Sequence, residues 1–206
     1  MKKISYKTIE RLIIYRKLLR AFASLGETHT YSYKIASILN AKPSQVRRDL
    51  MEIGYNGSPA YGYNIVELIK AITKLIDSST PEPVIIVGIG NLGRAIMDYS
   101  NSMESNLKII AGFDVDERKI NKVFHGVRVF HIDDLKKTIQ ENNIKIAILT
   151  TNKESSQSVA LDLISFGING ILNFTPVKLN LPSSIVVENI DMMVSLEKVA
   201  FFSRNI

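Results

Sequence analysis

Three glycines and one aspartate are the residues whose types and spacing point most directly to ligand chemistry. Gly88, Gly90 and Gly93 form a G-x-G-x-x-G pattern, and Asp114 follows 21 residues after Gly93. In a strand–turn–helix unit the first glycine permits a tight turn, the second lets the backbone approach a pyrophosphate, and the third lets the helix pack closely on the strand. The pyrophosphate then lies on the free N–H groups of the helix N-terminus. A carboxylate at the spacing of Asp114 accepts hydrogen bonds from the adenosine ribose, so the pattern predicts a dinucleotide site.

The elements that must position these residues are a buried strand, a helix and a second strand. Residues 84–87 are an aliphatic, β-branched run, residues 92–103 have the pattern of a helix, and residues 108–113 form a second apolar run that ends at Asp114. Such runs are typical of fully buried parallel strands. The glycines alone also fit an ordinary tight turn with a surface aspartate. The combination favours dinucleotide binding.

Strands and helices continue to alternate after this unit. The predicted elements are strand 127–130, helix 133–141, strand 145–150, helix 154–166, strand 170–174 and strand 185–187. The alternation predicts an α/β fold with a doubly wound parallel sheet and the glycine loop at the carboxyl ends of its strands.

The composition excludes several classes of site. The chain has 206 residues, 46% of them apolar, and no cysteine, so disulfides, thiolate nucleophiles and cysteine-bound metals are excluded. The three histidines, His29, His125 and His131, form no H-x-x-x-H pair, and we expect no metal site. We find neither a membrane-spanning run nor a signal peptide, and we expect a cytoplasmic protein.

The charge is concentrated at one end of the chain. Residues 1–80 contain 13 Lys and Arg against 6 Asp and Glu, whereas the remainder contains 13 against 14. A basic N-terminal third indicates a polyanionic partner, although a solvated basic face is the alternative.

The N-terminal third has the pattern of a helix-turn-helix. Residues 7–24 predict a helix with a wide apolar surface, Ser32 is a candidate N-cap of a short second helix, and Pro43 suits the first turn of a third helix, to about residue 53. The polar face of that third helix and the turn before it carry Lys42, Ser44, Gln45, Arg47 and Arg48. Arginine and glutamine can bond base edges, and serine with a helix N-terminus can hold phosphates. An ordinary amphipathic helix is the alternative.

The segments that follow complete the domain organisation. Asn56-Gly57 is a hairpin signal and predicts a wing, residues 65–76 predict a helix, and the Ser/Thr/Pro-rich stretch 78–83 predicts a linker. We therefore assign residues 1–77 to a winged-helix DNA-binding domain, 84–190 to a Rossmann NAD(H)-binding domain, and 191–206 to a C-terminal helix. That last helix is too apolar for water, so we expect it to pack on another subunit or on the N-terminal domain.

A winged helix-turn-helix followed by one Rossmann unit resembles the Rex family of redox-sensing transcriptional repressors. The resemblance covers essentially the whole chain, and its most specific pieces are residues 45–50 (QVRRDL), 62–65 (GYNI), 87–94 (VGIGNLGR), 112–116 (GFDVD), 170–174 (GILNF) and 187–191 (VENID). It implies a non-enzymatic repressor that binds an inverted-repeat operator as a homodimer, leaves it when NADH binds, and exchanges its C-terminal helix between subunits.

The resemblance also implies residue roles. Gln45, Arg47 and Arg48 would face DNA, Asp114 would bind the adenosine ribose, and Tyr99 and Phe174 would lie near the nicotinamide. The implied pyrophosphate loop consists of Gly88, Ile89, Gly90, Asn91, Leu92 and Gly93. Asp191 would form a charged contact with a cation on the first helix, here Lys17. The chain departs from the family at the wing, where Pro59 stands in place of the usual arginine.

The predicted cofactor is NAD(H). A carboxylate at Asp114 repels a 2′-phosphate, and no basic residue immediately follows it; Arg118 and Lys119 lie farther along. An apolar pocket formed by Tyr99 and Phe174 would prefer the neutral reduced ring over the cationic oxidised ring.

Two other functions fit parts of the sequence. An NAD-dependent oxidoreductase with an N-terminal interaction domain would need a substrate domain and an acid–base group, and the chain has no Tyr-x-x-x-Lys pair and no obviously placed histidine. A CoA- or nucleotide-binding module with an unrelated N-terminal domain is disfavoured by Asp114.

Overall fold

The computed structural model describes residues 4–101 and 105–204, and the chain divides into two compact units, Met1–Ser79 and Thr80–Ile206. The predicted helix 92–103 therefore ends outside the described residues. Each unit has its own apolar core.

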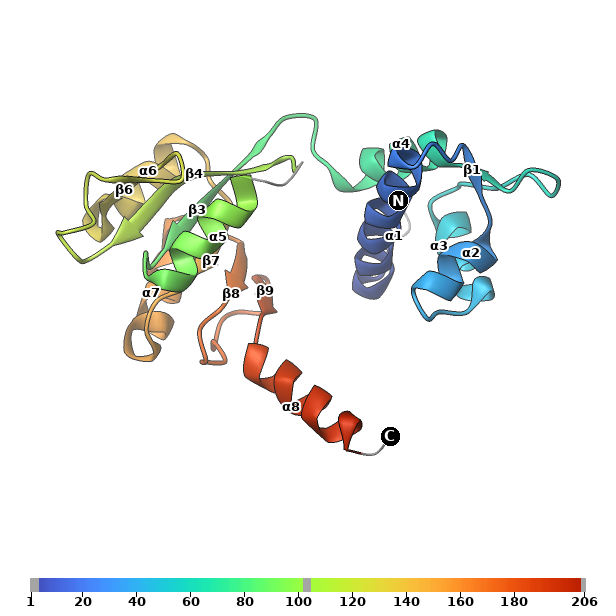
Figure 1. The fold of residues 1–206 in the computed structure, drawn as a ribbon. Coiled ribbons are helices and arrows are strands. Elements are labelled where there is room, and N and C mark those ends of the chain that lie inside the picture. The colour runs from blue at the N-terminus through green and yellow to red at the C-terminus, as the bar shows by residue number, and fades with distance from the viewer. Residues whose placement is uncertain (1–3, 102–104, 205–206) are drawn as a thin grey trace. The chain divides into compact units, whose positions relative to one another are not determined.

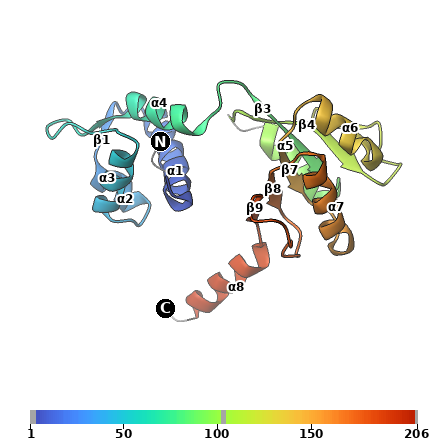
Figure 2. The ribbon, with the colours of Figure 1, turned by 180° about the vertical axis from the view of Figure 1, so that it is seen from behind.

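The first unit is helical with a two-stranded sheet. Its elements are α1 (Tyr6–Ser24), β1 (His29–Thr30), α2 (Ser32–Ile38), α3 (Pro43–Glu52), β2 (Tyr63–Asn64) and α4 (Ile65–Ile76). As Figures 1 and 2 show, α1 lies beside α4 and α2 lies beside α3. The core that joins these helices includes Leu12, Ile35, Val46, Leu50 and Leu68, all fully buried.

Two sequence predictions for this unit are wrong in detail. Tyr31, not Ser32, is the N-cap of α2, and the hydroxyl of Ser32 instead accepts a hydrogen bond from Arg47. The wing does not turn at Asn56-Gly57. The chain reverses between Ser58 and Gly62, because these two residues exchange backbone hydrogen bonds of 2.7 and 2.8 Å. The hydroxyl of Ser58 also accepts hydrogen bonds from the N–H groups of Ala60 and Tyr61, which fixes the loop.

The second unit is a seven-stranded sheet in the order β5-β6-β4-β3-β7-β8-β9. Its strands are β3 (Glu82–Val87), β4 (Leu107–Asp114), β5 (Val123–Phe124), β6 (Val127–His131), β7 (Ile146–Leu149), β8 (Gly170–Asn173) and β9 (Val186–Asn189). Its helices are α5 (Asn91–Asn101), η1 (Ile132–Asp134), α6 (Leu135–Glu141), α7 (Lys153–Phe166) and α8 (Met192–Ser203). All pairings are parallel except that of β5 with β6.

Helices cover both faces of this sheet. Ile85 and Val87 of β3 pack with residues of α6 and α7, whereas Val84 and Ile86 pack with Met97 of α5. Burial on both faces explains the uninterrupted apolar run of β3. Figure 1 shows α5 on one face of the sheet, and Figure 2 shows α6 and α7 on the other.

Two predictions for the sheet need correction. The sheet is not wholly parallel, because the short strand β5 pairs antiparallel with β6 at the sheet edge. Strand β5 is not among the elements that the sequence predicts. The strand β3 begins at Glu82, inside the predicted linker 78–83, since the N–H of Glu82 bonds the carbonyl of Asn106 at 2.8 Å.

The helix α8 leaves the sheet without packing on its own unit. Every described residue of α8 is exposed, including Leu196, Val199 and Phe202 at 58%, 64% and 66%. Within the described residues, no helix is long and apolar enough to cross a membrane.

A buried carboxylate joins α3 to α1. Asp49 is 1% exposed and receives two hydrogen bonds from the guanidinium of Arg11, at 2.6 and 2.7 Å. Tyr15 and Gln45 donate two more, at 2.9 and 2.8 Å. Burial by itself raises the pKa of Asp49, but these four hydrogen bonds outweigh it and hold the pKa below its usual range.

We expect the substitution Arg11→Met to lower the free energy of unfolding by about 3 kcal/mol at neutral pH, because it leaves the buried charge of Asp49 uncompensated. A lowered folded-state pKa stabilises the fold above the unfolded pKa, and this stabilisation is lost as the pH falls through the folded pKa. The difference between variant and wild type should therefore shrink in acid, where Asp49 is protonated in both. Urea denaturation at neutral pH and in acid measures it.

Lys70→Met is the matched control, because Lys70 pairs with Glu67 at the surface of α4, 68% exposed. An exposed pair contributes little to stability. Equal losses for the two variants would contradict the importance of the Asp49 network.

Candidate dinucleotide site and nucleic-acid interface

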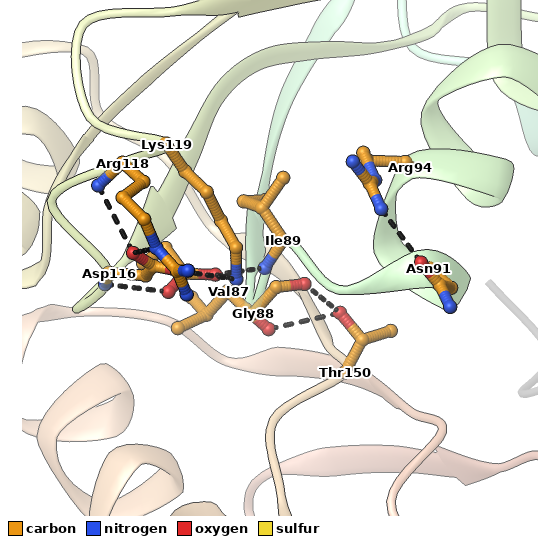
Figure 3. Close-up of polar contacts among 10 residues, drawn as sticks. Val87, Gly88, Ile89, Asn91, Arg94, Asp116, Arg118, Lys119 and Thr150 are labelled. Atoms are coloured by element: carbon orange, nitrogen blue, oxygen red, sulfur yellow. Dashed lines mark hydrogen bonds and ion pairs between the residues drawn. The ribbon is translucent and has the colours of Figure 1, made fainter.

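At two positions of the loop between β3 and α5, only glycine fits. Gly88 has φ +97°, and a Cβ there would lie 2.7 Å from the backbone of Thr150. A Cβ on Gly93 would overlap the carbonyl oxygen of Gly88. The hydroxyl of Thr150 lies 2.7 Å from that same oxygen and 3.1 Å from the carbonyl oxygen of Val87, so the residue directly after β7 also holds the loop (Figure 3).

Gly90 differs from the other two glycines. A Cβ on Gly90 would meet no atom within 4 Å, so the fold itself does not require a glycine there. Gly90 is exposed at the start of α5, where backbone N–H groups lack partners within the helix. An open approach to a helix N-terminus fits a pyrophosphate.

Asp114 lies at the carboxyl end of β4 and bonds directly to the glycine loop. Its Oδ2 accepts a hydrogen bond of 2.7 Å from the N–H of Ile89, and its Oδ1 accepts one of 2.9 Å from the N–H of Asp116. Lys119 adds an ion pair of 2.9 Å. Burial by itself raises the pKa of Asp114, but these donors outweigh it and keep the pKa below its usual range.

A hollow of about 320 Å³ lies along the carboxyl ends of the central strands. Its walls come from the ends of β3 and β4, the glycine loop, the turn after β4, the start of η1, the segment that follows β7, and α7. The lining residues are Val87, Gly88, Gly90, Phe113, Asp114, Val115, Lys119, Ile132, Thr150, Thr151, Asn152, Ser155 and Val159. The hydroxyl of Thr151 is buried there and has no hydrogen-bond partner among the described residues. The size of the hollow and its place at the carboxyl ends of the strands fit a bound nucleotide.

The structure brings together some of the predicted cofactor residues and not others. Gly88, Gly90 and Asp114 line the hollow. Ile89, Asn91, Leu92 and Gly93 belong to the same loop and helix start but do not line it. Phe174, directly after β8, packs against the apolar cluster that contains Ile89 and Met97. Tyr99 is 61% exposed on α5. Neither aromatic residue lines the hollow.

Sequence reasoning missed most of the residues that line the hollow, among them Lys119 and Thr151. Lys119 lies five positions after Asp114, and the turn between them returns its ammonium group to that carboxylate. Thr151 follows β7, whose carboxyl end lies at the same sheet edge as those of β3 and β4. The general rule that ligands bind at this edge could have indicated Thr151. No feature of the sequence indicates the fold of the turn before Lys119.

The predicted DNA-binding residues lie on and before α3. Lys42 is the N-cap, without a side-chain cap, and Ser44, Arg47 and Arg48 are exposed. Arg47 donates to the hydroxyl of Ser32 at 3.1 Å, so α2 positions its guanidinium. The amide of Gln45 donates to Asp49, and in this conformation its nitrogen is engaged within the unit.

The two predicted switch residues belong to different units. Lys17 is exposed on α1. Asp191 is the N-cap of α8, and its Oδ1 accepts hydrogen bonds from the N–H groups of Met193 and Val194 at 2.9 and 3.0 Å. Among the described residues, no group of three His, Asp or Glu side chains could hold a metal ion.

Comparisons with known proteins match both units. A family model described as "CoA binding domain" matches residues 79–177, and one described as "Putative DNA-binding protein N-terminus" matches residues 3–50. The redox-sensing transcriptional repressor Rex of Geobacillus kaustophilus (strain HTA426) is 36% identical over 98% of this chain and 95% of its own length. Rex of Bacillus subtilis (strain 168) is 34% identical over 98% of this chain and 94% of its own.

Solved structures match the whole chain. RSP, a Rex-family repressor, in complex with NAD⁺ and operator DNA is 30% identical, with a TM-score of 0.90 over 100% of this chain and 94% of that one. The complex of RSP with NADH is 29% identical, with a TM-score of 0.88 over 100% and 96%. Because it is 34–36% identical to curated Rex repressors over 98% of its length, the chain belongs to the Rex family of redox-sensing transcriptional repressors.

Proposed function

We propose that this protein is a transcriptional repressor that senses the ratio of NADH to NAD⁺. It binds an inverted-repeat operator as a homodimer, and NADH releases it. The observation that carries the proposal is that one chain joins a basic helix-turn-helix unit to a dinucleotide cradle, and that a protein solved with both NAD⁺ and operator DNA matches it from end to end. The family consists of repressors rather than enzymes, and we assign no catalytic residue.

The cradle supports a specific arrangement of the cofactor. The loop 88–93 and the start of α5 would hold the pyrophosphate, because a Cβ on Gly90 would meet no atom within 4 Å and a helix N-terminus favours an anion. Asp114 would accept hydrogen bonds from the adenosine ribose. Tyr99 and Phe174 would contact the nicotinamide, and their apolar rings would favour the uncharged reduced form.

The exposed helix α8 supports the homodimer. Its apolar residues have no cover within their own unit, and a contiguous apolar surface of this kind marks a protein interface. A second copy of the chain, exchanging α8, would bury it. Asp191 at its start would then face Lys17 of the other subunit, a pair whose geometry would change with the state of the cofactor.

The proposal predicts that NADH weakens operator binding far more than NAD⁺ does. To shift the protein from nearly all bound to nearly all free, NADH must prefer the free state by about 5 kcal/mol. Fluorescence anisotropy of an operator selected from randomised duplexes measures the release, and the titration end point should correspond to two chains per operator. If NADH and NAD⁺ release the protein from the operator equally, the redox-sensor proposal is wrong. If CoA releases the protein from the operator, or competes with NADH for the protein, the alternative of a CoA-binding module is favoured.

The substitution Gly90→Ala should remove the response to NADH without harming the fold. The new Cβ meets no protein atom within 4 Å, but it occupies the space through which the pyrophosphate approaches the backbone. We expect an unchanged melting temperature, unchanged operator affinity and at least a tenfold weaker binding of NADH. Calorimetric titration with NADH measures the last effect.

Gly170→Ala in β8 is the control, because its Cβ meets only ordinary contacts at 3.8 Å, away from the loop. If Gly90→Ala binds NADH as tightly as Gly170→Ala does, the pyrophosphate does not approach the backbone at Gly90.

The substitution Arg47→Ala should weaken operator binding by about 1–3 kcal/mol and relax the preference at one base pair if Arg47 reads a base edge. Selection from randomised duplexes, followed by affinity measurements on the selected and mismatched sites, reports both effects. Lys70→Ala removes the same charge from α4 and should leave the preference intact. A uniform loss across all sequences would make Arg47 a phosphate contact instead.

A further inference from the structure

The turn that follows β4 brings the side chain of Lys119 to Asp114, the carboxylate predicted to bind the adenosine ribose. Lys119 Nζ lies 2.9 Å from Asp114 Oδ2, the same oxygen that accepts the N–H of Ile89. Figure 3 shows the side chain of Lys119 extending toward the loop at Ile89. Backbone hydrogen bonds fix this return, since the N–H of Lys119 bonds the carbonyl of Asp116 at 2.8 Å. Lys119 is 27% exposed and lines the hollow. The ammonium group of Lys119 therefore lies at the predicted ribose subsite, where the sequence indicates only the carboxylate of Asp114.

The charge of Lys119 belongs to Asp114 rather than to its other acidic neighbour. Asp116 lies farther from the ammonium, at 3.7 Å, and already receives both ends of the guanidinium of Arg118, at 2.9 and 3.0 Å. The Arg118 hydrogen bonds lower the pKa of Asp116 to about 2, so that carboxylate is ionised and paired. Arg118 itself is 88% exposed and does not line the hollow.

The pairing changes what the subsite offers a ribose. An ionised carboxylate has about four lone-pair positions. Ile89, Asp116 and Lys119 occupy three of them, so Asp114 can still accept a hydrogen bond from a ribose hydroxyl. At the same time the ammonium cancels most of the negative charge that would repel a phosphate on the 2′ oxygen.

We propose that Lys119 is a specificity-determining residue of the adenosine-ribose subsite, and that its pairing with Asp114 makes the protein distinguish NADH from NADPH less sharply than Asp114 alone would. The inference rests on the proposed function, because it assumes that the hollow holds the adenosine half of the cofactor. Asp114 supplies the acceptor for the ribose, and Lys119 limits the electrostatic penalty on the 2′-phosphate.

Affinities for the two reduced cofactors test the proposal. NADH and NADPH carry the same fluorescent nicotinamide ring, and the chain contains no tryptophan that would contribute its own emission. The same fluorescence titration, run separately with each cofactor, therefore gives the two dissociation constants. We expect Lys119→Gln to raise the ratio of the NADPH to the NADH dissociation constant about tenfold. We expect Asp114→Asn to lower this ratio, because it leaves the ammonium free to meet the phosphate. The double variant should fall between them.

Arg118→Gln is the matched control, since it removes the same charge from the same turn at an exposed position. Its ratio should stay within about twofold of the wild type. The inference is overturned if Lys119→Gln leaves the ratio unchanged, or if Arg118→Gln shifts the ratio equally. The proposed function still stands in that case, provided that the wild-type protein binds NADH. A wild-type protein that binds neither cofactor overturns both.

Discussion

The close approach of backbone to backbone at the turn between β3 and α5 is the constraint on which the second unit depends. The carbonyl of Gly88 lies so near Gly93 that no side chain fits there. The hydroxyl of Thr150, directly after β7, donates a hydrogen bond to that same carbonyl. This contact sets where α5 begins, and hence where its unpaired N–H groups face. It also sets the position of the N–H of Ile89, which Asp114 requires. This one steric condition thus aligns the ends of three strands around the predicted cofactor site.

Each unit contains a buried aspartate that accepts several hydrogen bonds and so connects neighbouring elements. Asp49 connects α3, the helix with the predicted DNA-binding residues, to α1 through Arg11. Asp114 connects β4 to the glycine loop and to Lys119. In both cases burial disfavours the charge, and several donors outweigh it. A carboxylate that needs all its donors fixes their relative positions more strictly than apolar packing does, because each unmade hydrogen bond to a buried charge is costly.

Elements whose signal is local could be predicted from the sequence. The apolar run of β3, the glycine spacing and Pro43 at the start of α3 each carry their physical reason within a few residues. The strand β5 and the wing turn were missed because two-residue strands and a turn closed by Ser58 and Gly62 have no periodic pattern. Lys119 was missed as a site residue because its position depends on how a six-residue turn folds back, and spacing along the chain does not determine that.

A redox sensor must distinguish two cofactors that differ only in the nicotinamide ring. The hollow that a single chain forms lies beside Asp114 and the glycine loop, which in our proposal hold the ribose and the pyrophosphate, groups common to both forms. The hollow can therefore supply affinity for the cofactor, but it cannot distinguish NADH from NAD⁺. A ligand shifts an equilibrium only by its difference in affinity for the two states. Discrimination has to come from groups beyond the hollow. Tyr99 and the uncovered helix α8 are exposed in the single chain, so the part of the site that reads the redox state is the part we expect a second copy of the chain to complete.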